Sequence, residues 1–417
     1  MARIALSDSD GPRKSLRRLV DLAIAVRERA AGPTPTPPGR SELLDLARLF
    51  LRLGTTAFGG PAAHIAMMEE QVVRRRGWLT REAFLDLLGA ANLIPGPSST
   101  EMAIYIGQRR SGWRGLALGG VCFILPAALI TLAIAWSYVR FGSLPQVGAA
   151  LDGVKPVVIA VVLQALWGLG RTAVKSRLLA VLACAALAAA FAGVNILVVL
   201  FSTGALAVAA RRAAEAPKAR TAGGIALPGR LLPAASAAAA AVPVGLGSLF
   251  LVFLKVGALL FGSGYVLLAF LRADLVTRLH WLTESQLLDA VAVGQVTPGP
   301  VFTTATFIGY VLGGGPGALV ATLGIFLPSF VFVAASGPLV PRLRRSPIAG
   351  AFLDGVNVAS LALMATVTWH LARGALVDVL SIALAGVSAL LLMRFRVNSA
   401  WLVLGGALIG ASKLWLR

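Results

Sequence analysis

The chain has 417 residues, of which 57% are hydrophobic and only 13% are charged. A soluble domain carries about 25% charged residues, so this composition predicts an integral membrane protein and excludes an ordinary soluble one. The formal net charge is +20, which in a soluble protein would suggest a nucleic-acid partner. Because most Lys and Arg stand in short loops between apolar runs, we interpret the excess as the charge bias that orients membrane proteins. We expect no nucleic-acid partner.

The sequence carries no common signature of metal, nucleotide or thiol chemistry. Cys122 and Cys184 both lie in apolar runs, which argues against a disulfide framework and a thiolate metal site. Neither an HExxH motif nor a Walker-type phosphate loop occurs. We therefore expect a protein that is not an enzyme and that needs no cofactor and no metal.

The chain begins with a predicted tail, residues 1–40. Residues 13–29 are compatible with a basic amphipathic helix on the membrane surface, and residues 32–39 form a Pro-rich linker. An extension with no role in transport is the alternative interpretation. We expect a first transporter repeat over 41–210, a basic and Ala-rich linker over 211–243, and a second repeat over 244–417.

A first helix is predicted from Ser41 to Phe58, followed by a stretch over 62–76 that is too charged to span a membrane. Trp78 is typical of a membrane interface, and Thr80 is typical of a helix start. The helix after Thr80 breaks at Pro95-Gly96-Pro97, and a short piece continues to Arg110. Each piece is too short to cross the membrane, which takes about 20 helical residues. Conventional spans are expected over 115–139, 154–170, 178–191 and 195–210.

The Pro95-Gly96-Pro97 break is the sharpest local signal. Two prolines around a glycine prevent a regular helix, and the hydroxyl residues Ser98-Ser99-Thr100 that follow favour a helix N-terminus. A break at membrane depth is tolerated only where it is buried in protein or lines a cavity. We therefore expect two re-entrant half-helices that meet at this tripeptide.

The second half of the chain repeats the first. Arg52 matches Lys255 and Pro95-Gly96-Pro97 matches Pro298-Gly299-Pro300, both at an offset of 203 residues. After a gap of one residue the offset becomes 202, as in the match between residues 151–154 and 353–356. A constant offset over a long stretch indicates internal duplication.

The charges of equivalent loops predict that the two repeats are inverted. Arg109, Arg110 and Arg114 precede the span at 115–139, whereas the equivalent residues 313–317 carry no charge. The loops that follow alternate in the same way, with opposite bias in the two halves. We predict an all-α polytopic membrane protein of two inverted-topology repeats with broken half-helices. Inversion requires an odd number of membrane crossings between equivalent points of the two repeats, but the number of clear spans between them is even. The misassigned crossing would be Ser41–Phe58 or the Ala-rich segment 234–241.

Two half-helix N-termini that converge from inverted repeats could cradle an anion. Each presents unpaired backbone N–H groups and the positive end of a helix dipole. The candidate binding residues are the two breaks and the hydroxyls after them: Pro95, Gly96, Pro97, Ser98, Ser99, Thr100, Pro298, Gly299, Pro300, Thr303 and Thr304. A pair of structural kinks without a ligand is the alternative.

Two lone cations and a second pair of breaks extend this candidate site. Arg52 and Lys255 each stand inside an apolar helix, where a charge is expensive and usually functional, although snorkelling to the interface is the alternative. Gly59-Gly60 and Gly262-Ser263-Gly264 allow either close approach to a ligand or tight helix crossing.

Three residues are candidates for proton coupling. Glu101 directly follows the hydroxyls of the first break, and the equivalent position in the second repeat is Thr304. An acid beside an anion site could couple transport to protons, or it could pair with an Arg. His64 and Glu70 are weaker candidates.

The residues of these motifs resemble the chromate ion transporter family in its long, two-domain form. The matching segments of the first half are Phe50–Gly54, Phe58–Pro61, Arg75–Leu79, Leu93–Met102 and Cys122–Pro126. Those of the second half are Phe253–Ala258, Phe261–Gly264 and Thr297–Pro300. The resemblance covers residues 41–417. It departs from the family at Asn92, where glutamine is more usual, whereas Gln295 keeps that residue; either amide can donate to an oxygen.

The resemblance implies a multi-pass protein of the bacterial inner membrane that exports chromate from the cytoplasm and confers chromate resistance. Sulfate or another tetrahedral oxyanion, taken up or exported, remains open because it shares the charge and shape of chromate. A lipid flippase or scramblase is the alternative from another class, and an intramembrane reductase is disfavoured by the lack of a redox site. The expected partners are the oxyanion and the lipid bilayer, and self-association into a homo-oligomer is compatible with both.

Overall fold

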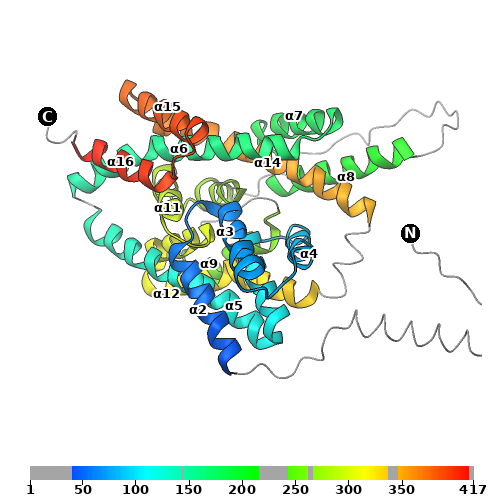
Figure 1. Cartoon of the computed structure of the whole chain (residues 1–417). Helices are drawn as coiled ribbons and strands as arrows, with labels where there is room; N and C mark the ends of the chain where they lie inside the picture. The colour runs from blue at the N-terminus through cyan, green and yellow to red at the C-terminus, as the bar shows by residue number, and fades with distance from the viewer. Residues whose placement is uncertain (1–39, 143, 216–242, 262–265, 337–345, 413–417) are drawn as a thin grey trace, which may run out of the picture.

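The computed structural model describes residues 40–142, 144–215, 243–261, 266–336 and 346–412 (Figure 1). Every regular element in these ranges is helical. The tail before residue 40, the Ala-rich segment 234–241 and the predicted site residues Gly262, Ser263 and Gly264 lie outside the described residues.

The two repeats contain the same series of elements. The first repeat consists of α2 (Arg40–Thr56), α3 (Gly60–Glu69), the π-helical η1 (Glu70–Arg75), α4 (Arg81–Ala91), α5 (Ser98–Phe141), α6 (Pro145–Ala173), α7 (Arg177–Phe191) and α8 (Ile196–Glu215). The second consists of α9 (Leu246–Leu259), α10 (Leu267–Leu271), the π-helical η3 (Arg272–Arg278), α11 (Glu284–Val296), the 3-10 turn η4 (Val301–Thr303), α12 (Thr304–Ser336), α14 (Pro347–Ala375), α15 (Val379–Arg394) and α16 (Ser399–Ser412).

Equivalent side chains start and interrupt equivalent helices. The hydroxyl of Thr80 accepts a hydrogen bond from the amide of Ala83 at the start of α4, and Thr283 does the same at the start of α11. Helix α5 loses helical backbone angles at Ser111 and Gly112, and α12 does so at Gly313 and Gly314. The predicted short half-helix up to Arg110 is therefore confirmed, and the long span begins after a kink.

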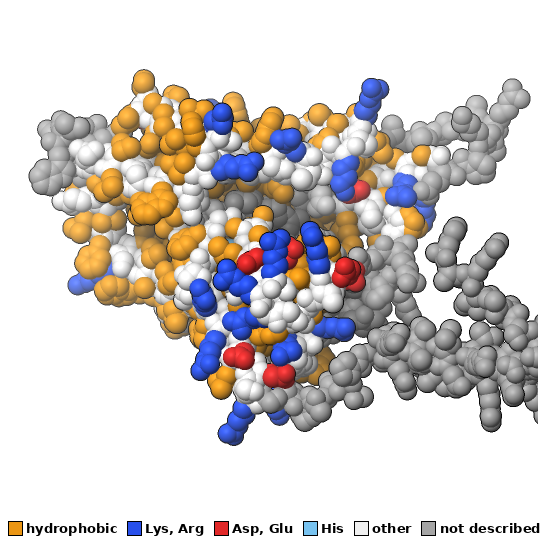
Figure 2. Space-filling view, in the orientation of Figure 1, with side chains coloured by type: hydrophobic (Ala, Val, Ile, Leu, Met, Phe, Trp, Pro, Cys, Tyr) orange, Lys and Arg blue, Asp and Glu red, His pale blue; other side chains and the backbone are white. Residues whose placement is uncertain are grey.

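The outer surface is suited to lipid. Five described helices, α5, α6, α8, α12 and α14, are long and apolar enough to cross a membrane. Tryptophans project from this surface, as is typical of membrane proteins: Trp113, Trp136, Trp167, Trp369 and Trp401. On the face in Figure 2, charged side chains gather over α2, α3 and α4, whereas α15 and α16 present mostly hydrophobic atoms.

The packing of α5 against α12 confirms the inverted topology. The hydroxyl of Tyr105 donates to Ser336 Oγ at 2.7 Å, near the start of one helix and the end of the other. Further along, Thr131 of α5 donates to Thr303, just before α12, at 3.2 Å. The first part of each helix therefore lies against the later part of its counterpart, a reciprocal arrangement that agrees with inverted repeats.

The remaining spans exchange partners between the repeats. Helix α6 packs against α15 and α16, whereas its counterpart α14 packs against α7 and α8 (Figure 1). Gly153 of α6 lies against Gly406, and the equivalent Gly355 of α14 lies against Gly204. Small residues permit such close crossings in lipid, so the two repeats form one interlocked body.

Helix α2 does not cross the membrane. Arg110 forms an ion pair with Glu42 at 3.2 Å, and its guanidinium lies 5.2 Å from the centroid of the Trp78 ring. The start of α2 and the residues after η1 therefore lie at the same end of the molecule, so α2 and α3 form a re-entrant hairpin. The predicted crossing over Ser41–Phe58 is therefore wrong, and the other candidate, the Ala-rich segment 234–241, lies outside the described residues.

Candidate functional site

The two Pro-Gly-Pro breaks are joined by a reciprocal pair of hydrogen bonds. The amide of Gly96 donates to the carbonyl of Leu260, and the equivalent amide of Gly299 donates to the carbonyl of Ala57, both at 2.8 Å. Both glycines have positive φ, of 138° and 89°, which a residue with a Cβ adopts only with strain. These two amides already have backbone partners, so the remaining donors near the breaks must supply any anion contacts.

The surroundings of Gly96 contain buried polar groups without hydrogen-bond partners among the described residues. The carboxyl group of Glu101 is fully buried, and neither of its oxygens has a hydrogen-bond partner. The hydroxyl of Ser329, from α12 of the other repeat, is also buried and unpartnered. A Cβ atom on Gly96 would collide with both side chains, so Glu101 and Ser329 flank this glycine from two repeats.

The surroundings of Gly299 have different chemistry. The position equivalent to Glu101 is Thr304, whose hydroxyl donates to the carbonyl of Val301 at 2.8 Å. The position equivalent to Ser329 is Ala127, whose Cβ faces Gly299. The sequence difference between the repeats therefore places one unpaired acid beside the first break and no acid at the equivalent position beside the second.

A cavity of about 650 Å³ opens beside the first break. It lies between the half-helices α3 and α4 on one side and the spans α6 and α14 on the other. Its first-repeat polar lining includes two predicted residues, Asn92 and Ser98, while Asn357 and Ser360 of α14 come from the second repeat. Lys175 and Asp354, joined by an ion pair of 2.8 Å, line its exposed end.

Four of these polar residues, Asn357, Ser360, Lys175 and Asp354, were not expected from the sequence. Asn357 and Ser360 are polar positions within an otherwise apolar span, which is the signal that could have identified them. Lys175 belongs to the basic loop after α6, where its charge is explained by membrane orientation alone. Only the packing of α14 against α6 shows that these residues face the first break.

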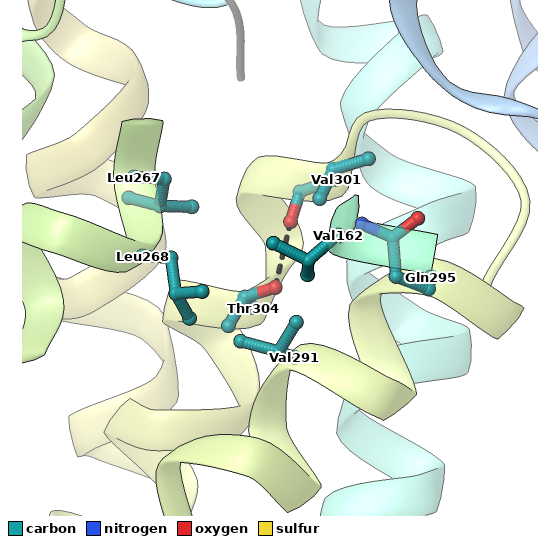
Figure 3. A pocket seen from close by; sticks show the side chains of 7 residues that line it. All are labelled: Val162, Leu267, Leu268, Val291, Gln295, Val301 and Thr304. Atoms are coloured by element: carbon teal, nitrogen blue, oxygen red, sulfur yellow. Dashed lines mark hydrogen bonds between the residues drawn. The ribbon is translucent and has the colours of Figure 1, made fainter. Parts of the chain in front are cut away.

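The described residues around the second break enclose a much smaller space. A pocket of about 20 Å³ lies beside it, lined by Val162, Leu267, Leu268, Val291, Gln295, Val301 and Thr304. Figure 3 shows the Thr304 hydroxyl directed at the Val301 carbonyl and aliphatic side chains around it. Helices α10 and α11 pack against α14, and α11 also packs against α6 and α16. Among the described residues, the first break therefore adjoins the larger cavity and the second is packed more tightly.

Near the second break, three hydroxyl side chains form a small cluster. Thr131 of α5 donates to Thr303 at 3.2 Å and lies 3.5 Å from Thr297. Thr303 donates in turn to the carbonyl of Pro300 at 2.9 Å. These hydroxyls are buried and engaged with one another or with the backbone, which stabilises the closed arrangement.

Lys255, predicted from the sequence as a lone cation in an apolar helix, has a counter-charge in the structure. Its ammonium group binds both carboxylate oxygens of Asp274, at 2.9 and 2.8 Å, and Arg278 binds the same carboxylate at 3.1 Å. Asp274 is 5% exposed, so it supplies a buried counter-charge that the residue spacing did not reveal. Arg52, the equivalent of Lys255, is exposed on α2 and is not among the described residues that line either cavity.

The other predicted residues lie around the first repeat. Gly59 and Gly60, both with positive φ, make the turn from α2 to α3 next to Pro61, which lines the large cavity. His64 is buried and its Nε2 lies 3.1 Å from the carbonyl of Ala57. Glu70 forms ion pairs with Arg74 and Arg75, so it belongs to the charged end of the molecule.

The charge pattern identifies the side on which the large cavity opens. Lys175 at its mouth is 61% exposed and stands between Arg171 and Arg177 in the sequence. Asp354 lies near the start of α14, and the sequence just before this helix includes Arg342, Arg344 and Arg345. Basic loops face the cytoplasm, so the cavity opens to the cytoplasm and the second break faces the opposite side.

The chain matches the chromate transporter family over residues 44–209 and again over residues 247–411, one match for each repeat. The chain belongs to the chromate transporter family. It is 36% identical to a chromate transport protein of Cupriavidus metallidurans, with 91% of this chain and 95% of the relative covered. It is 34% identical to a chromate transport protein of Pseudomonas aeruginosa, with 90% and 93% covered. An uncharacterised transporter of Methanocaldococcus jannaschii is 28% identical, with 78% and 83% covered. No solved structure matches.

Membership agrees with the architecture. The family is a transport family, and this member is a multi-pass protein of the bacterial inner membrane. The resemblance read from the sequence motifs is thereby confirmed.

Proposed function

We propose that the protein exports chromate from the cytoplasm and thereby confers chromate resistance. The observation that carries this proposal is the cytoplasmic cavity at the first break, lined by amide and hydroxyl groups of both repeats. The names of the relatives from Cupriavidus metallidurans and Pseudomonas aeruginosa support chromate as the substrate.

The cavity has the donors that a tetrahedral dianion requires. The amide groups of Asn92 and Asn357 and the hydroxyl of Ser98 can each donate to an oxyanion. The Ser360 hydroxyl now donates to the Phe261 carbonyl at 3.4 Å and would have to release this long bond to donate to the anion. Ser98 is also the first residue of α5, whose unpaired N–H groups and dipole favour negative charge. Lys175 adds a cation at the entrance, partly compensated by Asp354.

The membrane potential favours this direction of transport. Moving a charge across 100 mV is worth about 2.3 kcal/mol, so the exit of a dianion from a negative-inside cell is downhill. Export by uniport is therefore sufficient on energetic grounds. We also propose that Glu101 carries a proton that regulates the transition between states, because its buried carboxyl group has neither hydrogen-bond partner nor exposure.

Uptake of radiolabelled chromate into inside-out vesicles tests the proposal, with sulfate as competitor. We expect uptake above that of vesicles without the protein, and a reduced rate for Asn92→Ala. Ser202→Ala on α8, whose hydroxyl bonds within its own helix, is the control and should keep the wild-type rate. The absence of uptake above empty vesicles would refute chromate export, and equal competition by sulfate would broaden the substrate to oxyanions in general.

A further inference from the structure

The two repeats adopt different states although their sequences are related. Asn92 beside the first break is exposed, whereas its counterpart Gln295 is 9% exposed. The cavity separates α3 and α4 from α6 and α14, while α10 and α11 pack on α14. In a molecule of inverted repeats, exchanging these two states closes the cytoplasmic cavity and opens an equivalent one on the other side.

We infer that the second break forms a second anion vestibule, on the non-cytoplasmic side, in which Lys155 supplies the cation. This inference rests on the proposed transport function. Helices α6 and α14 are related by an offset of 202 residues, so Lys155 is the counterpart of Asn357 and Val158 is the counterpart of Ser360. At the breaks, where the offset is 203 residues, Gln295 is the counterpart of Asn92. The second vestibule thus has an amide at the break, as the first does, but a cation on the facing span.

The environment of Lys155 fits a cation that is shielded in the present state. Its side chain is 18% exposed, and its Nζ atom donates to Asp152 at 2.7 Å. It also interacts electrostatically with Asp289 of α11, a residue that is 4% exposed and accepts a hydrogen bond from Tyr138 at 3.0 Å. When α11 moves away from α6, Asp289 moves with it, and Lys155 loses part of its compensation. A movement that opens the vestibule to solvent would therefore also raise its positive electrostatic potential.

The contacts at the breaks permit this exchange. The hydrogen bond from Gly96 to Leu260 and the one from Gly299 to Ala57 are equivalent under the repeat relationship. If the two repeats exchange their states, both hydrogen bonds can therefore remain. The contacts of α10 and α11 with α14 have no equally close counterpart at α3 and α4, where the cavity lies. The breaks act as the pivot, and the half-helices move against the spans.

Labelling of introduced cysteines from each side of the membrane tests the second vestibule without relying on chromate. In a background where Cys122 and Cys184 are replaced by alanine, we compare Val158→Cys with Ala160→Cys; both wild-type side chains are 0% exposed and lie on α6. A membrane-impermeant thiol reagent added to right-side-out vesicles should label the cysteine at 158 and not that at 160. Ser360→Cys, at a position that lines the first cavity, should be labelled in inside-out vesicles.

The result that overturns the inference is protection of the cysteine at 158 from outside while that at 360 is labelled from inside. Labelling that follows the expected pattern without chromate transport would instead keep the vestibule and reject chromate as the substrate. The role of the cation is tested by transport: Lys155→Ala should lower the rate at least 10-fold, and Lys155→Arg should restore most of it. Arg394→Ala, on the exposed end of α15, is the matched control, and equal rates for Lys155→Ala and this control would remove Lys155 from the path.

Discussion

The amide of Gly96 donates to the carbonyl of Leu260 at 2.8 Å, and this bond joins the first Pro-Gly-Pro break to the end of α9 in the other repeat. Gly299 and Ala57 repeat the relationship in the opposite sense at the same distance. Each broken helix is therefore completed by the other repeat, which satisfies backbone groups that lipid could not. The two breaks form one structural unit and cannot be separated without losing both bonds.

Replacement of Gly96 by alanine should disrupt this unit. The glycine has φ of 138°, and the added Cβ would collide with the carboxyl group of Glu101 and lie 2.8 Å from Ser329 Oγ. The backbone strain alone costs about 1–3 kcal/mol. We expect a lower melting temperature in detergent and loss of transport. Gly148→Ala on α6, where a Cβ meets nothing within 4 Å, should leave both unchanged, and an equally stable Gly96→Ala would contradict the proposed constraint.

Asp274→Asn should destabilise the folded protein. The carboxylate of Asp274 binds both Lys255 and Arg278, so its loss leaves two cations without their partner. Because Lys255 is 36% exposed, we expect a cost below the roughly 3–5 kcal/mol measured when fully buried pairs are broken. Thermal unfolding in detergent measures it. Glu70→Gln removes an exposed acid that also binds two arginines and should cost no more than about 1 kcal/mol; similar shifts for both variants would argue against a buried structural role for Asp274.

Glu101→Gln should remove the pH dependence of transport and preserve the fold. The carboxyl group is buried without a hydrogen-bond partner, so the state described here requires its neutral form. Rising pH should therefore deplete this state and slow wild-type turnover. Tyr105 is the titratable neighbour that interacts with Glu101 electrostatically. The glutamine stays neutral at every pH, so its rate profile should be flat. A glutamine variant that keeps the wild-type profile would assign the dependence to another group.

Asn357→Ala should weaken substrate binding with little effect on stability. Its side chain lines the large cavity from the second repeat, and removal of one donor to a charged ligand costs about 1.5–3 kcal/mol. We expect the KM for chromate to rise about 10-fold or more in inside-out vesicles, with the melting temperature unchanged. Asn357→Gln, which keeps the amide, should recover part of the affinity. An unchanged KM in both variants would place the substrate elsewhere.

Much of the architecture could be predicted from the sequence because it depends on local chemistry. Thr80 and Thr283 start helices through their own hydroxyls, and the Pro-Gly-Pro tripeptides stop helices because proline lacks an amide hydrogen. The offset between Pro95 and Pro298 established the duplication, and the alternating basic loops indicated inversion, with which the reciprocal packing of α5 and α12 agrees.

The candidate site was only partly predictable, because local chemistry does not determine which distant residues pack together. Asn92 and Ser98 adjoin the first break in sequence and do line the cavity, but Asn357 and Ser360 reach it from a span more than 250 residues away. Lys255 looked unpaired because Asp274 stands 19 residues further on, after the chain has turned back through α10. Partners brought together by helix packing leave no fixed spacing in the chain.

The sequence by itself determined that this protein consists of two inverted membrane repeats, each with a broken half-helix. Hydrophobic length, proline and loop charge are properties of neighbouring residues, and they act before the chain is packed. Only the tertiary structure decided that the first break opens onto a cytoplasmic cavity and that α10 and α11 pack tightly beside the second. Equivalent sequences can occupy different states, since the choice between them lies in the packing of one repeat against the other.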